Sequence, residues 1–309
     1  NVVGTLIFIA LCMVTPFVDW MIATNPANPA AQIANVHTIF NIATTVILFP
    51  FGNTLVKIAK KILPDTQTKK VMDADQWFEG LMASKHHLGV STIAISQIHE
   101  EIRDMLAMAA TNVSESFKAM EQGPGEEGIQ EIADREEEID LSNVRLSKKI
   151  SKVLVLDQTP QDIEALNKMY SILGNIERIG DHAMNLAEYA QTIQEKQLNF
   201  SAYAKNEFRV MDESCALGME LLRKAAAGES GFTLEQIQQI EQKIDDITDN
   251  FRQNQIERMR EGHCNVESSI LYSEMLTDYE RIGDHMLNIG EAYDAIQWNN
   301  DNAVALTEE

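Results

Sequence analysis

The sequence predicts an all-α protein in which a transmembrane helical hairpin precedes a bundle of two three-helix repeats. Three observations support this fold class. From residue 92 to residue 297, apolar residues recur every three or four positions, as in Ile95, Ile98 and Ile102, which is the spacing of one helix face. A twelve-residue motif in that region occurs twice. The first 56 residues hold two long apolar stretches and no lysine or arginine.

Six helices are expected in the region from 92 to 297, because glycine and proline interrupt its apolar pattern. The breaks include G-P-G at 123–125, T-P at 159–160 and G-E-S-G at 228–231, and such residues end or begin helices. The expected helices are 92–121, 127–155, 160–194, 203–227, 233–260 and 266–297.

The repeated motif indicates an internal duplication. E-R-I-G-D-H at 177–182 returns at 280–285, which is 103 residues later (280 − 177), and both copies continue to an Asn and a Glu at the same spacing. A second pair of motifs, E-E-E-I-D at 136–140 and E-Q-K-I-D at 241–245, is separated by 105 residues (241 − 136). Because two separate motifs share nearly one period, the region is interpreted as two copies of a three-helix unit.

Paired carboxylates are the candidate functional residues of both repeats. Each repeat holds two E-x-x-x-D pairs on neighbouring helices, and the i, i+4 spacing places both carboxylates of a pair on one helix face. Like charges one turn apart weaken a helix, and a bound cation removes that repulsion. Oxygen ligands suit Mg, Mn and Fe ions, and Zn can also be held. The candidate metal ligands are Glu136, Asp140, Glu177, Asp181, Glu241, Asp245, Glu280 and Asp284.

Other residues of the repeated motif allow two interpretations. Gly180 and Gly283 lie in the middle of expected helices, where Gly costs about 1 kcal/mol relative to Ala, so we expect a closely approaching neighbouring helix as compensation. His182 and His285 could bind a metal or donate hydrogen bonds to its ligands, or they could be polar residues beside the core. The carboxylates themselves could form solvated acidic faces, since the chain has 47 acidic residues.

Composition and the lack of several motifs exclude some classes of function. The formal net charge of −22 argues against nucleic-acid binding, which needs a basic surface. The sequence contains no E-x-x-H, G-x-S-x-G, P-loop or C-x-x-C motif, so we expect neither an enzyme nor an organic cofactor. Three scattered cysteines, Cys12, Cys215 and Cys264, are expected to be free thiols in a reducing compartment.

The N-terminal region is expected to cross a membrane twice. The apolar run Val2–Val18 is near the lower length limit for a span, and a second span is expected from about Ile33 to Val56. Lysines follow directly at 57, 60 and 61, which by the positive-inside rule predicts that the rest of the chain lies in the cytoplasm. His37 and Asn41 lie one turn apart on the second span, where they either line a transport path or hydrogen-bond between helices.

At this point two resemblances can be stated. The doubled E-R-I-G-D-H-x-x-N-(L/I)-x-E motif, each copy preceded by E-x-x-I-D, resembles the PhoU fold, whose members bind metal clusters through E-x-x-x-D motifs. Upstream, A-N-V-H-T-I-F-N at 34–41 and the following T-T-V-I-L-F-P-F resemble the closing transmembrane segment of bacterial sodium/phosphate cotransporters. The Q-S-S motifs and the G-x-N-I-G-T-T signature of that transporter family are absent, and they are expected before Asn1.

The resemblances together imply the C-terminal part of a sodium:phosphate symporter with a cytoplasmic PhoU-like domain that binds Fe, Mn, Zn or Mg and regulates phosphate uptake. They imply phosphate, the coupling ion Na⁺, the lipid bilayer and a second copy in a homodimer as partners, and a multi-pass location in the bacterial inner membrane. One alternative is a membrane-tethered PhoU-like phosphate-signalling regulator without transport activity, and another is a helical scaffold without metal. The expected divisions are 1–61 for the membrane part, 62–91 for a linker, 92–297 for the PhoU-like domain (repeats 92–195 and 203–297) and 298–309 for a tail.

Overall fold

The computed structural model describes residues 12, 14–24, 26, 29–48, 73–82, 90–123, 125–156, 158–229, 231–262 and 264–296. The chain divides into two compact units, Asn1–Thr66 and Gln67–Glu309. In the first unit, α2 (Phe17–Thr24) packs against α3 (Pro29–Leu48). Proline is well suited to the first position of α3, because its fixed φ matches the helix and its missing N–H would have no helical partner there.

The expected transmembrane hairpin is not supported. Among the described residues, no helix combines the length and the apolar character needed to cross a bilayer. α2 has eight residues, whereas a span needs about 20, and α3 reaches that length but includes the polar residues Asn35, His37 and Asn41. Most of Val2–Val18 and the end of the second expected span lie outside the described residues. The expected multi-pass location in the inner membrane is therefore wrong.

The second unit holds the predicted bundle. Its six long helices begin and end within two residues of the predicted positions. They are α7 (Val90–Gln122), α8 (Glu126–Val153), α9 (Pro160–Glu195), α10 (Ala202–Ala226), α11 (Leu234–Arg260) and α12 (Val266–Ala295).

Capping residues explain why the helices begin and end where they do. The Thr159 hydroxyl accepts a hydrogen bond from the backbone N–H of Asp162, and the Asp162 carboxylate accepts one from the N–H of Thr159, which is a capping box at the start of α9. Thr233 and Gln236 form the same arrangement at the start of α11. Gly262, just after α11, has a φ of +73°, a conformation that glycine adopts without the strain of a side chain.

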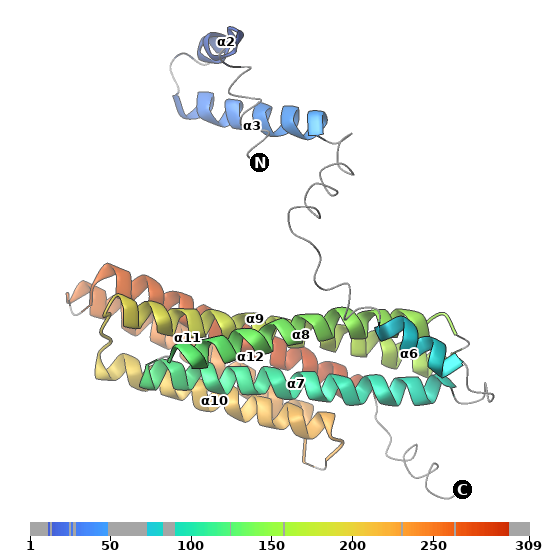
Figure 1. Ribbon diagram of the computed structural model, residues 1–309. Coiled ribbons are helices and arrows are strands. Elements are labelled where there is room, and N and C mark those ends of the chain that lie inside the picture. The colour runs from blue at the N-terminus through green and yellow to red at the C-terminus, as the bar shows by residue number, and fades with distance from the viewer. Residues whose placement is uncertain are drawn as a thin grey trace, which may run out of the picture. The chain divides into compact units, whose positions relative to one another are not determined.

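The six helices pack as the duplication predicts. α7, α8 and α9 pack against one another, and so do α10, α11 and α12. The two triplets meet where α9 packs on α12 and α7 packs on α10, and Figure 1 shows the long helices lying side by side. One continuous core fills both triplets, with the Phe117 and Tyr279 rings stacked at 5.2 Å across it. The all-α bundle is thus confirmed.

A further helix, α6 (Asp73–Met82), lies in the segment that was expected to be a linker. It packs on α8 and α7. The Trp77 indole Nε1 donates to the Gln97 side-chain oxygen at 2.8 Å, and Lys149 Nζ lies 4.8 Å from the centre of the Trp77 ring. Ala74 is buried as well. A ten-residue helix is marginal by itself, so these contacts to the bundle stabilise it.

Candidate metal centres

The two mid-helix glycines mark where α8 approaches α9 and where α11 approaches α12. A Cβ added at Gly180 would lie 3.4 Å from Ile139 Cδ1, and one added at Gly283 would lie 3.3 Å from Ile244 Cδ1. Ile139 stands between the two carboxylates of its E-x-x-x-D pair, and so does Ile244. Close packing of Ile on Gly therefore brings the acidic pair of one helix towards the acidic pair of the next, and the predicted reason for the glycines is confirmed.

The first cluster forms between α8 and α9. Ligand oxygens of Glu136, Asp140 and Asp181 all lie within 4.8 Å of one another, and the three side chains are half-buried. Glu177 precedes Asp181 by one turn and lies outside this close group. It is nevertheless a neighbour, because burial and then the Asp181 and Asp140 charges raise its pKa, while Arg178 acts in the opposite direction.

The second cluster repeats this arrangement between α11 and α12. Ligand oxygens of Glu241, Asp245 and Asp284 lie within 4.8 Å of one another. The remaining predicted ligand, Glu280, instead accepts a hydrogen bond from Arg252 at 2.7 Å. Buried Oδ1 of Asp245 has no hydrogen-bond partner. An unpartnered buried carboxylate oxygen is costly, and a cation at this position would offset that cost.

Both clusters hold like charges close together. Burial and then the charges of Asp140 and Asp181 raise the pKa of Glu136 to about 6. Burial is also the largest cause of the raised pKa values of Asp140, Glu241 and Asp245, followed in each case by a neighbouring carboxylate. Three carboxylates without nitrogen or sulfur donors fit a hard or borderline cation, so Mg, Mn and Fe suit both clusters.

The arginines of the repeated motif lie at the edges of the clusters. Arg178 approaches Asp181 at 3.5 Å, and Arg281 approaches Asp284 at 2.9 Å. Both arginine side chains are more than half exposed, so these ion pairs contribute little to stability. They leave each aspartate with further oxygen lone pairs for a cation.

The two histidines of the motif do not join the clusters. His182 Nδ1 lies 2.6 Å from Asp278 Oδ1, and His285 Nδ1 lies 2.9 Å from Asn175 Oδ1. The two imidazole rings stack with their centres 5.6 Å apart. Sequence reasoning did not identify Asp278 and Asn175, although both stand the same seven residues before their repeat's histidine.

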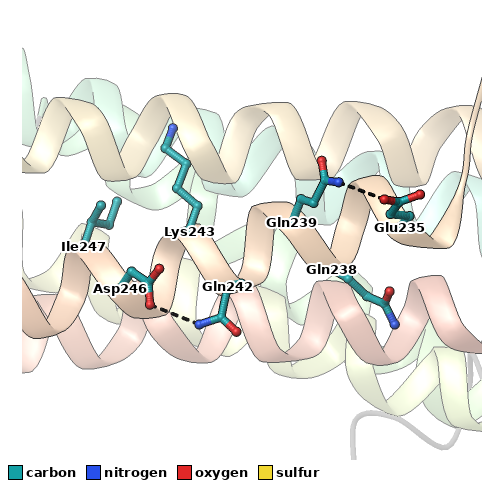
Figure 2. Close-up of a pocket in the computed structure, with 7 residues that line it drawn as sticks. All are labelled: Glu235, Gln238, Gln239, Gln242, Lys243, Asp246 and Ile247. Carbon is teal, nitrogen blue, oxygen red and sulfur yellow. Dashed lines mark hydrogen bonds between the residues drawn. The ribbon is translucent and has the colours of Figure 1, made fainter.

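Two other features include none of the clustered carboxylates. The predicted transport-path residues His37 and Asn41 are exposed on α3, in the first unit. Figure 2 shows a shallow polar surface along α11, where Gln239 donates to Glu235 at 3.2 Å and Gln242 donates to Asp246 at 3.1 Å. Its side chains pair along one helix and include none of the predicted ligands, so it is a solvated helix face.

The raised pKa of Glu136 leads to a prediction for the metal-free chain. The pKa of this carboxyl is about 6 in the folded state and 4.5 in the unfolded state, so the protonated form stabilises the fold. The stabilisation is complete below pH 4.5 and is lost as the pH rises through about 6. In the presence of chelator, the free energy of unfolding of the wild type, measured with urea, should therefore fall between pH 4.5 and pH 7. The fall should be smaller in Glu136→Gln. Glu127→Gln, an exposed change on the same helix, should follow the wild type. Parallel curves for all three would contradict the burial and charge crowding of Glu136.

Comparison with known proteins identifies similar chains. Residues 102–190 and 211–293, together more than half of the chain, match the family model described as PhoU domain. The chain is 21% identical over 198 residues to a phosphate-specific transport system accessory protein PhoU homolog 1 of Thermotoga maritima, covering 64% of this chain and 84% of the relative. A Synechocystis protein named as a phosphate-specific transport system accessory protein PhoU homolog is 27% identical over 201 residues, covering 61% and 84%.

The fold agrees with these matches. The crystal structure of PhoU from Pseudomonas aeruginosa superposes with a TM-score of 0.61 and 18% sequence identity, covering 67% of this chain and 98% of that one. At this level of identity the likeness concerns the fold. Each of the two matched segments contains all three carboxylates of one acidic cluster.

Proposed function

The chain belongs to the PhoU domain family, and from that premise we propose that it is an accessory protein that regulates phosphate transport through cation binding at its two acidic clusters. The observation that carries the proposal is the pair of matching three-carboxylate clusters, one in each segment that matches the family model. The relatives are named as accessory proteins of a phosphate-specific transport system, and the prediction that the chain is not an enzyme is confirmed.

The cation would be held by Glu136, Asp140 and Asp181 in the first repeat, and by the equivalent three carboxylates in the second. It would neutralise charges that otherwise repel one another between packed helices. Glu177 and Glu280 lie one turn from the clusters and are the next oxygen donors available to them. Fe, Mn, Zn and Mg remain the proposed ions, and the oxygen-only donor set favours the harder ones.

The findings support a phosphate-transport accessory protein better than a part of a sodium:phosphate symporter. The matches to the family model begin at residue 102, within α7, whereas the symporter interpretation rests on the short stretch 34–51. No finding supports sodium, a lipid bilayer or a homodimer as a partner. We propose 92–297 as the regulatory domain, with repeats at 92–195 and 203–297, which contain both matched segments.

The proposal is tested by phosphate uptake in cells of the native host from which the gene has been deleted. Cells that carry the wild-type gene should lower their uptake of labelled phosphate when moved from low to high phosphate, and the deleted cells should not. Asp181→Asn with Asp284→Asn should behave like the deletion, because each cluster loses a ligand charge. Asp104→Asn with Glu257→Gln removes two exposed charges from the same bundle and should behave like the wild type. Unchanged regulation in the deleted cells would overturn the proposed function.

A further inference from the structure

The contact between α9 and α12 is reciprocal. His182 of the first repeat reaches Asp278 of the second at 2.6 Å, and His285 of the second repeat reaches Asn175 of the first at 2.9 Å. These residues are equivalent in the duplication, because 278 − 175 and 285 − 182 both equal the motif period of 103. The residue numbers rise along one helix as they fall along the other, so the two helices run antiparallel through the contact.

The amides of the repeated motif complete the same arrangement. Asn185 Nδ2 donates to Asp278 Oδ1 at 3.2 Å, and Asn288 Nδ2 donates to Asn175 Oδ1 at 3.1 Å. These two asparagines are also 103 residues apart (288 − 185). We call this group of six residues the inter-repeat strap: Asn175, His182, Asn185, Asp278, His285 and Asn288.

The strap adjoins both acidic clusters. His182 directly follows Asp181, the α9 member of the first cluster, and His285 directly follows Asp284, the α12 member of the second. In each cluster, one aspartate is therefore followed directly by a histidine that hydrogen-bonds to the opposite repeat. A small rotation of α9 on cation binding would alter the strap contacts and with them the position of α12, since packed interfaces move between discrete arrangements.

The two halves of the strap differ in charge. The acceptor for His182 is Asp278, which is 7% exposed, whereas the equivalent acceptor for His285 is the neutral Asn175. The half with Asn175 can therefore be altered without leaving a buried charge unpaired, which makes it the better half for substitution.

We propose that the inter-repeat strap couples the two clusters, so that a cation at one cluster raises the affinity of the other. This inference rests on the proposed cation binding. Its residues act as positioning residues, because they hold the helices that carry the ligands and are not ligands themselves. A first cation fixes the packing of α9 on α12, and a second then binds to helices that are already ordered.

The test is a cycle of Mn²⁺ titrations on the full chain by calorimetry. Glu241→Gln with Asp245→Asn silences the second cluster, and the affinity of the first cluster is measured with and without this change. Silencing also removes two negative charges, which weakens binding through space in any background. The effect of silencing is therefore measured again in His285→Phe, which keeps a stacked ring but loses the hydrogen bond to Asn175. The direct charge effect is the same in both backgrounds, so the difference between them measures the coupling through the strap. Asn175→Ala provides an independent second variant, and circular dichroism checks that each variant folds.

Silencing should weaken Mn²⁺ binding at the first cluster about fivefold more in the wild-type background than in His285→Phe or Asn175→Ala, since couplings between sites usually reach at least that size. An equal loss in the wild-type and in both strap backgrounds would overturn the coupling while leaving cation binding in place. No Mn²⁺ binding by the wild-type chain would overturn the cation part of the proposed function, and the coupling with it.

Discussion

Mn²⁺ bound at both clusters is expected to raise the melting temperature of the chain by about 10–20 °C over that in chelator. A ligand at 100 times its dissociation constant stabilises the folded state by about 2.7 kcal/mol per site. For a bundle of this size, 1 kcal/mol corresponds to roughly 2–4 °C. The gain is large here because the cation removes repulsion between half-buried carboxylates such as Glu136 and Asp140. Calorimetric melting of the full chain measures it.

Asp181→Asn with Asp284→Asn should abolish most of that difference. The same variant should melt at a higher temperature than the wild type in chelator, because each change removes one of three crowded charges. The control Asp104→Asn with Glu257→Gln removes two exposed charges elsewhere in the bundle and should keep the full response to Mn²⁺. Identical melting of the wild type with and without Mn²⁺, Fe²⁺ and Zn²⁺ would mean that the clusters are solvated acidic faces.

Glu207→Ala is expected to destabilise the chain by about 3–5 kcal/mol, the cost of breaking a buried ion pair. Glu207 Oε2 lies 2.8 Å from an Arg258 nitrogen and accepts a hydrogen bond from the Tyr272 hydroxyl at 2.5 Å. Oε1 accepts another from Asn254 at 2.9 Å. The two charged side chains are only 9% and 14% exposed, so the change would leave the guanidinium buried without its counter-charge.

Urea unfolding measures this loss, and two variants control it. Glu207→Gln keeps hydrogen-bonding atoms at the site and should lose less stability than Glu207→Ala. Glu213→Ala, on the same helix, breaks an ion pair with Arg209 in which both side chains are at least half exposed, and it should cost less than about 1 kcal/mol. Equal effects of Glu207→Ala and Glu213→Ala would show that burial does not set the strength of the Glu207 pair.

Local sequence signals were sufficient for the bundle. Apolar spacing, glycine and proline breaks and capping residues such as Thr159 and Thr233 act within one or two helical turns, so they can be read without knowing the fold. They were not sufficient for the N-terminal segment. Apolar composition alone does not decide whether a segment crosses a bilayer, and no helix among the described residues is long and apolar enough to do so.

The sequence by itself determined which residues could form the candidate centres, because i, i+4 spacing fixes the face of a helix and the 103-residue period fixes the equivalence of the repeats. Only the tertiary structure decided which of them meet. The packing of Ile139 on Gly180 and of Ile244 on Gly283 sets the height at which the helices cross, so Asp181 and Asp284 enter the clusters while Glu280 pairs with Arg252. The crossing of α9 and α12 likewise places the two histidines in the strap, since contacts between helices depend on their relative positions and not on spacing along either one.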